Sequence, residues 1–311
     1  MYYPYFRGKQ YELLTIRENA GLLSASNFVP IIEPVKESLG ALKRALAAVR
    51  DAGGSAIVIV NPYHGDHAED GLGISTFLGE EFADDDEIGV GILLRENMTV
   101  ENAMACYGQH ADHQRTFIHA GFTQAKALAE QLGDELPDTQ HVFLEPVCGK
   151  LYRKHFDGCN RILIRDGFKK RRNKDHPLLE PFSDLHVTYP DEGMNGFGDF
   201  LTVGDEYSES GGPAYAVAIH VTFVDPAKDN EMFVYHFVSE SQDTPTDPAG
   251  KFAEALEAMI DTLDNIHTPV LETNAIQAFR DLHDEGHFPG LGVVKKLSMQ
   301  HHIETLAAFF E

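Results

Sequence analysis

Residues 29–60 read VPIIEPVKESLGALKRALAAVRDAGGSAIVIV, and this stretch decides the fold. Two short apolar runs, Val29 to Glu33 and Ala56 to Val60, flank the segment from Ser38 to Arg50, in which leucine and valine recur at helical spacing. An apolar strand, an amphipathic helix and a second apolar strand form one strand–helix unit of a mainly parallel sheet. The stretch therefore predicts an α/β protein.

The same alternation continues on both sides of this stretch, as far as residue 166. Further short apolar runs end in a polar residue, and most are followed by a helical pattern. They are Tyr2 to Phe6, Ile88 to Leu94, Thr116 to Ile118, His141 to Leu144 and Arg161 to Ile164. Seven units before residue 166 approach the eight of a (β/α)8 barrel, so we predict a TIM-barrel-like single domain over residues 1–311. An open, doubly wound sheet is the alternative.

The pattern changes after Asp166. Residues 167–213 are rich in Gly, Pro, Asp and Tyr, and two alternating runs then follow, Tyr215 to Phe223 and Met232 to Val238. These runs predict an antiparallel hairpin, which we expect to supply the last barrel strand and an extension. The predicted parts are regular β/α units over 1–166, an irregular loop plus hairpin over 167–240, and C-terminal helices over 248–311, near 248–263, 273–285 and 298–310.

Composition limits the classes of partner. The chain has 49 acidic and 25 basic residues, for a formal charge of −24, and such a polyanion repels nucleic-acid phosphates. Bulk nucleic-acid binding is therefore disfavoured. The dense basic run from Lys169 to Lys174 predicts either a local basic patch or, as usual for short charge runs, a solvated surface.

The cellular location is predicted from two features that the sequence does not contain. It contains no apolar stretch of membrane-spanning length and begins without the features of a secretory signal, which predicts a cytoplasmic protein with no membrane partner. Cys106, Cys148 and Cys159 match no zinc or disulfide framework, so we expect free thiols.

Two segments near the N-terminus carry a family resemblance. Residues 3–14, YPYFRGKQYELL, followed by residues 29–34, VPIIEP, resemble a group of uncharacterised bacterial proteins that is itself similar to the beta-protein family of phages and mobile elements. The resemblance implies a barrel-like fold and a place among phage-defence or mobile-element genes, with a neighbouring-gene protein as partner. It carries over no catalytic residues.

In a (β/α)8 barrel, functional side chains gather where strands end, because the strands aim them into one shared mouth. A mixed ring of acids and bases at these ends predicts either a binding site for a small anionic substrate or an ordinary polar rim. The strand ends carry Arg7, Glu33, Asn61, Arg95 with Glu96, His119, Glu145, and Arg165 with Asp166.

Glu33 and Glu145 occur in matching local sequences, since each ends an apolar strand directly before a proline. They end the second and sixth predicted strands, which lie opposite each other in an eight-stranded barrel. Two such carboxylates could hold a divalent metal, Mg²⁺, Mn²⁺ or Zn²⁺, or divide acid and base roles. In the alternative, Glu-Pro simply ends each strand and the carboxylate pairs with an arginine of a neighbouring strand.

A second metal candidate follows the third predicted strand. His64, Asp66 and His67 offer three ligands on one loop, suited to zinc, manganese or iron together with Glu33 or Glu145. The sequence has 16 histidines, so an accidental cluster is the alternative.

Other residues give weaker signals. Cys148 is a candidate nucleophile, with a buried inert thiol as the alternative. Asp199 and Asp205 lie on Gly-flanked turns, and His301-His302 we interpret as surface or capping residues. Walker A, Gly-x-Gly-x-x-Gly, Gly-x-Ser-x-Gly and His-Glu-x-x-His motifs are absent from the sequence, which argues against nucleotide-loop and serine-hydrolase functions.

The leading hypothesis is a barrel enzyme that hydrolyses or transfers a phosphate-containing or other anionic substrate, with or without a divalent metal. A non-catalytic, partner-binding barrel of a phage-defence or mobile-element system is the rival, and a nuclease component using residues 169–174 is a minor alternative. In the leading hypothesis Glu33 and Glu145 are the metal ligands or acid/base pair, His119 is a base, Asp166 is catalytic, Arg7, Arg95 and Arg165 clamp the anion, and Asn61 contacts the substrate.

Overall fold

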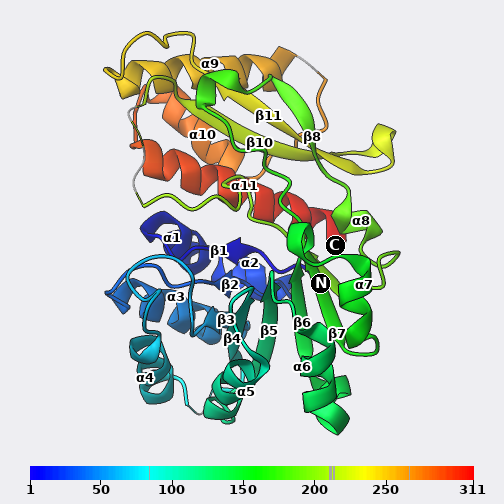
Figure 1. Cartoon of the computed structure of the whole chain (residues 1–311). Helices are drawn as coiled ribbons and strands as arrows, with labels where there is room; N and C mark the ends of the chain where they lie inside the picture. The colour runs from blue at the N-terminus through cyan, green and yellow to red at the C-terminus, as the bar shows by residue number, and fades with distance from the viewer. Residues whose placement is uncertain (84, 210–211, 213, 266) are drawn as a thin grey trace. The chain divides into compact units, whose positions relative to one another are not determined.

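The computed structural model describes residues 1–83, 85–209, 212, 214–265 and 267–311, which fold into two compact units (Figure 1). The first unit comprises Met1–Arg165 and Thr188–Asp199, and the second comprises Asp166–Val187 and Phe200–Glu311. The change of unit after Arg165 coincides with the change of sequence pattern after Asp166. The single domain over residues 1–311, with its three parts, stays a prediction.

The first unit is a barrel of eight parallel strands. In sheet order they are β1 (Tyr5–Phe6), β2 (Ile31–Ile32), β3 (Ala56–Ile59), β4 (Ile88–Arg95), β5 (Arg115–Ala120), β6 (Gln140–Leu144), β7 (Asn160–Ile164) and β9 (Gly196–Gly198). Backbone hydrogen bonds from Tyr3 N to Phe197 O (2.8 Å) and from Tyr5 N to Asp199 O (2.9 Å) connect the last strand to the first. The predicted barrel is confirmed, and the open sheet is wrong.

The seven predicted strands before residue 166 are present, each within a few residues of its expected bounds. Helices follow most of them and lie around the outside of the barrel (Figure 1). The helical segments are α1 (Gln10–Glu18), α2 (Ala20–Ala25), α3 (Gly40–Asp51), α4 (Leu72–Glu81), α5 (Val100–Gln109), α6 (Ala125–Leu132), η1 (Gly133–Asp138), η2 (Glu145–Val147), α7 (Lys150–Arg153) and η3 (Lys154–Phe156).

The eighth barrel strand is β9, not the predicted hairpin. Its sequence, Gly196-Phe197-Gly198, has no alternating apolar pattern, because Tyr3 leaves no room for side chains at the two glycines. A Cβ at Gly196 would lie 2.8 Å from the Tyr3 ring, and one at Gly198 would overlap the Tyr3 carbonyl oxygen and the Ile164 side chain. Close backbone approach therefore requires glycine in the strand that closes the barrel.

The second unit is built on a three-stranded antiparallel sheet in the order β10–β11–β8. The predicted hairpin is confirmed as β10 (Ala218–Asp225) and β11 (Glu231–Val238), and β8 (Leu179–Ser183) pairs with β11. Side chains of the hairpin, such as Ile219 and Phe237, form one buried core with the C-terminal helices. The remaining segments are η4 (Asn173–Asp175), α8 (Leu185–Thr188), η5 (Pro226–Lys228), α9 (Pro248–Asn265), α10 (Asn274–Asp284) and α11 (Leu291–Phe310).

Helix α11 begins at Leu291, earlier than predicted, so His301 and His302 lie in its interior. Both are fully buried, which corrects their interpretation as surface or capping residues. His301 Nε2 lies 2.7 Å from Thr222 O, and His302 Nδ1 lies 3.0 Å from Thr222 Oγ1. The two imidazoles are buried because α11 packs along β10 and their polar atoms find partners there.

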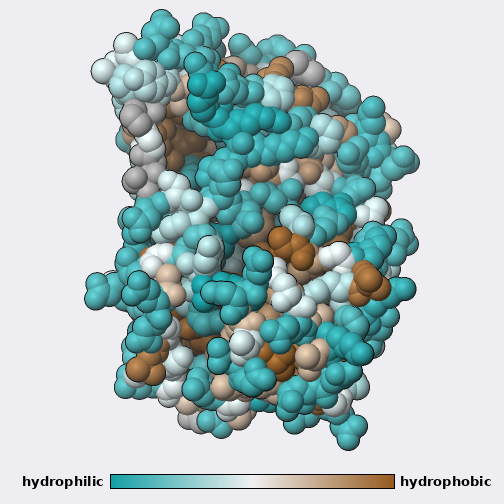
Figure 2. Space-filling model, in the orientation of Figure 1, coloured by the Kyte–Doolittle hydropathy of each residue, from teal (hydrophilic) through white to brown (hydrophobic). Residues whose placement is uncertain are grey.

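In the described part of the chain, each helix is too short or too polar to cross a lipid bilayer. The face of the molecule shown in Figure 2 is mostly hydrophilic, and its hydrophobic residues form small, separate patches. This surface agrees with the acidic composition of the chain.

Candidate functional site

Glu33 is the centre of a buried polar cluster at the carboxyl end of β2. Its side chain is fully buried and forms an ion pair with Arg7, which follows β1. The same carboxylate oxygen accepts a hydrogen bond from Tyr5 OH (3.1 Å). The other oxygen accepts from Tyr63 N (2.8 Å) and His64 N (3.0 Å), and lies 3.2 Å from His64 Nδ1. Every face of this carboxylate is therefore occupied by protein.

These partners keep Glu33 ionised. Burial alone would raise the pKa of its carboxyl group, but the His64 hydrogen bond, the charge of Arg7 and the Tyr63 N–H outweigh burial and lower the pKa to about 2. A carboxylate with so low a pKa is a poor proton donor or acceptor near neutral pH. Glu33 instead ties β1 and β2 to the loop after β3, which is the arginine-pairing alternative that the sequence left open.

The loop after β3 is held tightly, and the side chains of His64 and Asp66 contact different partners. Gly65 has a φ of +79°, and a Cβ there would overlap the backbone of Val35. His64 contacts Glu33, whereas Asp66 Oδ2 accepts a hydrogen bond from Glu37 N (2.8 Å). Nε2 of His67 is buried without a hydrogen-bond partner among the described residues. The structure does not gather His64, Asp66 and His67 into one group of metal ligands.

The side chain of Asn61 forms hydrogen bonds with the backbone of Leu93. Its side-chain amide donates to Leu93 O (2.9 Å), and its side-chain carbonyl accepts from Leu93 N (2.8 Å), so it connects the segment after β3 to β4. Both ends of the amide are occupied, and a contact with substrate stays a prediction.

Arg95 ends β4 and differs from the other predicted clamp residues. Its guanidinium lies 5.2 Å from the centre of the Tyr63 ring, a cation–π contact, and Tyr63 is 59% exposed. Among the described residues, its buried Nε has no hydrogen-bond partner and no carboxylate lies within ion-pairing distance of the side chain. Arg95 thus presents an uncompensated positive charge beside an exposed aromatic ring.

Glu145 and Arg165 form a second acid–base pair at the carboxyl ends of β6 and β7. Arg165 Nε lies 2.6 Å from Glu145 Oε2, and its Nη2 lies 2.9 Å from Oε1, so the pairing is bidentate. The side chains are 27% and 31% exposed, and water reaches both. Glu145 therefore also follows the arginine-pairing alternative, although its carboxylate is far more accessible than that of Glu33.

His119 points away from the predicted mouth, toward α7 and η3. It is completely buried, with Nδ1 2.6 Å from Tyr152 OH and Nε2 2.9 Å from His141 Nδ1, and it stacks on Phe143 with a ring-centre separation of 4.7 Å. Burial lowers the pKa of His119 well below its usual range, and the neighbouring His141 adds to this effect. The prediction that it lies at the barrel mouth is wrong, because side chains alternate between the two faces of a strand.

The direction of this hydrogen-bond chain is fixed at its far end. Thr139 Oγ1 donates to Leu136 O (2.6 Å), so it must accept from His141 Nε2 (2.7 Å). His141 Nδ1 then accepts from His119, whose own Nδ1 accepts from Tyr152 OH. Both imidazoles are neutral with every nitrogen satisfied, which makes them structural groups.

The remaining candidates also have structural partners. The Cys148 thiol donates to His119 O (3.2 Å), and burial raises its pKa to about 11, which agrees with an inert thiol. Tyr2 OH donates to Asp199 (2.7 Å). In the second unit, Asp166 accepts from Phe168 N (2.9 Å) and Asp205 N (2.8 Å), as a turn-forming aspartate does.

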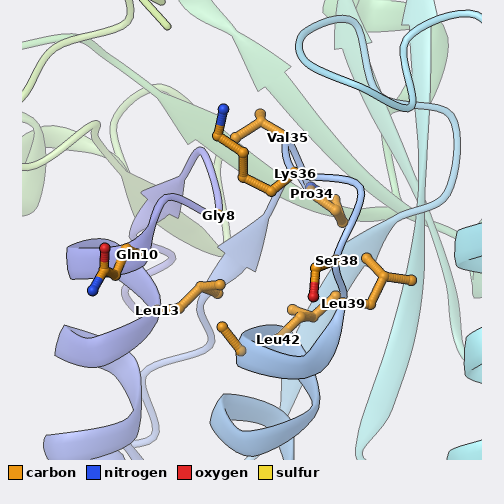
Figure 3. A pocket seen from close by; sticks show the side chains of 10 residues that line it. Gly8, Gln10, Leu13, Pro34, Val35, Lys36, Ser38, Leu39 and Leu42 are labelled. Carbon is orange, nitrogen blue, oxygen red and sulfur yellow. The ribbon is translucent and has the colours of Figure 1, made fainter. Parts of the chain in front are cut away.

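A small hollow of about 100 Å³ lies between α1 and the loop that leads into α3 (Figure 3). Its apolar lining includes Leu13, Leu39 and Leu42, and its polar lining residues are Gln10, Lys36 and Ser38. Its lining contains no arginine, histidine or carboxylate, and none of the predicted site residues, although Gly8 and Pro34 directly follow Arg7 and Glu33.

Sequence reasoning missed a histidine cluster in the second unit. His176, His220 and His236 each bring a ring nitrogen to within 4.8 Å of the others. His220 and His236 are directly opposite each other in the β10–β11 pair. The predicted hairpin already carried this signal, because aligning its two strands places the two imidazoles side by side on one face.

At the barrel mouth, the structure thus brings together Arg7, Glu33 and His64, and Arg95 lies nearby against the Tyr63 ring. Glu145 pairs with Arg165. His119 lies on the opposite face of its strand. The roles of these residues on a substrate, and the family resemblance of residues 3–34, stay predictions. No protein-family model matches the chain, and no curated protein matches it in sequence.

Proposed function

We propose that the barrel binds a phosphate-containing or other small anionic substrate at its mouth, anchored by Arg95, and catalyses its hydrolysis or group transfer. One observation carries the proposal: Arg95 stands at the carboxyl end of a barrel strand with no carboxylate partner in the described part of the chain. The carboxyl ends of the strands are where barrels of this fold bind their substrates.

The environment of Arg95 favours an anion. A buried donor without an acceptor costs about 1–3 kcal/mol, and a charged one costs more, so an oxyanion that accepts from Arg95 would recover this energy. The Tyr63 ring orients the planar guanidinium without neutralising it. Arg7 and Arg165 differ, since carboxylates already compensate their charges.

Glu145 is the acid–base group that best fits this function. An anionic substrate that competes for Arg165 would release the Glu145 carboxylate, which is already partly exposed. The freed carboxylate would then accept a proton from an attacking water or hydroxyl group. We give no such role to Glu33 or His119, because protein groups occupy every hydrogen-bonding position of both side chains.

The test is binding of inorganic phosphate and pyrophosphate to the whole chain, measured by calorimetry at low ionic strength. The Arg95→Gln variant should bind at least tenfold more weakly, because about 1.5–3 kcal/mol is lost with each charge-assisted hydrogen bond. Arg115→Gln is the matched control, since Arg115 also stacks on a tyrosine, Tyr107, but at the amino end of β5.

Arg115→Gln should leave binding of both anions unchanged. Equal anion binding by wild type and Arg95→Gln would overturn the proposal, as would the absence of binding to the wild type at 10 mM, roughly the weakest affinity that one such contact supports. In the second case the partner-binding barrel becomes the better hypothesis.

The cytoplasm is the proposed location. All three cysteines are free, as thiols generally are in that compartment. The nuclease alternative stays a prediction. In its basic run, Lys169 and Arg171 pair with Glu180, and Arg172 pairs with Asp175.

A further inference from the structure

Three histidines of the second unit converge on one point. His176 follows η4, His220 lies on β10 and His236 lies on β11, so the cluster draws on three separate segments of the chain. The ring centres of His176 and His236 are 4.2 Å apart, and Phe168 packs against the cluster, with its ring centre 4.9 Å from that of His220. The strands and the aromatic wall hold the imidazoles together before any ligand arrives.

The hydrogen bonds of the cluster direct a lone pair to its centre. His236 Nε2 lies 3.1 Å from Glu180 Oε1, and a carboxylate only accepts, so the proton of His236 is on Nε2. The Nδ1 of His236 therefore carries a lone pair and faces His220 Nδ1 at 2.8 Å. The Nδ1 of His176 is buried and has no hydrogen-bond partner among the described residues.

Charge in the cluster is arranged as metal ligands require. His236 is a neutral imidazole in this arrangement, because its Nε2 donates to Glu180 and its Nδ1 accepts from His220. Glu180 is held in place by hydrogen bonds that Arg171 and Lys169 donate to its carboxylate. Neutral imidazoles backed by a fixed carboxylate are a typical metal-binding arrangement.

The alternative is a hydrogen-bonded polar cluster without a ligand. It accounts for the contact between His220 and His236, but it leaves His176 Nδ1 buried and unsatisfied, which costs about 1–3 kcal/mol. A metal bound through Nδ1 of His176 would satisfy this nitrogen together with the Nδ1 atoms of His220 and His236. His220 then moves its proton to Nε2, so that both Nδ1 lone pairs of the hairpin face the ion.

We propose that His176, His220 and His236 bind one zinc ion, with Glu180 orienting His236 from behind. Zinc bonded to nitrogen at 2.0–2.1 Å holds tetrahedral ligands about 3.3 Å apart, between the closest separation of 2.8 Å and the upper limit of 4.8 Å found here. Magnesium and calcium fit poorly, because they require several oxygen ligands. Three protein ligands leave the fourth zinc position open, and His176 and His220 are half-buried, so water can occupy it.

The experiment is titration of the EDTA-treated, dialysed whole chain with ZnCl2 by calorimetry, with the bound metal counted by mass spectrometry. The wild type should bind one zinc per chain with a Kd below about 1 μM, typical of a three-histidine site. His176→Gln and His236→Gln should each weaken binding at least tenfold. His176→Gln is the safer variant because it removes no hydrogen bond found between described side chains, and circular dichroism verifies that each variant is folded.

The matched control is the double variant His64→Gln/His67→Gln, which removes the two histidines of the barrel loop. It should bind zinc like the wild type. Zinc binding that survives His176→Gln and His236→Gln but is lost in the control would overturn the proposal in favour of the loop. A wild type that binds no zinc at 100 μM, roughly a hundredfold above the expected Kd, would leave the cluster a hydrogen-bonded one. The result is independent of anion binding at Arg95.

Discussion

Replacing Glu33 with glutamine should destabilise the barrel strongly, whereas the same change at Glu145 should be mild. Both glutamates end a barrel strand before a proline and pair with an arginine of the neighbouring strand. They differ in burial, since Glu33 is fully buried and Glu145 is 31% exposed. The two variants therefore separate the effect of burial from that of local sequence.

Two estimates give the magnitude for Glu33→Gln. Lowering its pKa from 4.5 to about 2 corresponds to about 3 kcal/mol of native-state stabilisation at neutral pH. Breaking a buried pair and leaving Arg7 uncompensated costs about 3–5 kcal/mol. We expect a loss in this range, against about 1 kcal/mol or less for Glu145→Gln, whose ion pair is exposed to solvent.

The assay is urea unfolding at pH 7, followed by circular dichroism because the chain contains no tryptophan. Since two units can unfold separately, each transition is fitted on its own. Depressed acid pKa values stabilise the fold above the unfolded pKa, so the gap between wild type and Glu33→Gln should shrink as pH falls from 4.5 toward 2.

A Glu33→Gln variant as stable as the wild type, or more stable, would refute this reasoning. That outcome would mean that the carboxylate is held under strain, as functional groups often are, and would return Glu33 to the list of catalytic candidates. An equally large loss in Glu145→Gln would instead show that burial does not decide the cost.

Two further predictions concern protonation and barrel closure. His141 and His301 are buried and neutral, with pKa values lowered to about 3 and about 4 mainly by burial, so their stabilisation is complete above the unfolded pKa of 6.5 and is lost as pH falls below it. The free energy of unfolding measured with urea should therefore be lower at pH 5 than at pH 7.5, by about 2 kcal/mol for each imidazole, and an unchanged value would contradict their burial as neutral groups. Gly198→Ala should cost more than about 2 kcal/mol, because its Cβ overlaps the Tyr3 carbonyl oxygen, whereas Gly21→Ala, in open space on α2, should stabilise by about 0.5–1 kcal/mol. Equal thermal shifts in the two alanine variants would show that the close approach of β9 to β1 is not needed for closure.

The sequence alone was sufficient to predict those strands and helices whose apolar residues recur with the period of the buried face. The strands of residues 1–166, the hairpin near residues 215–238 and the C-terminal helices follow from apolar periodicity, because each buries one face or both. The Glu-Pro pattern located both carboxylates at strand ends, and the arginine-pairing alternative was also available from sequence. The solvent exposure of the two carboxylates could not be predicted from sequence, and it is the property in which Glu33 and Glu145 differ.

Tertiary structure alone decided the features that depend on what packs across from a residue. Strand β9 has glycines where side chains would identify a strand, because Tyr3 occupies that space. His119 faces Tyr152 and not the mouth, since a shift of one residue in the assumed strand end reverses every side chain. The three histidines meet only because folding brings His176, far from the hairpin in sequence, against the pair formed by His220 and His236. The periodicity of apolar residues indicates which face of a segment is buried. A site is formed by contacts between segments that are distant in sequence, and the local sequence of each segment does not specify those contacts.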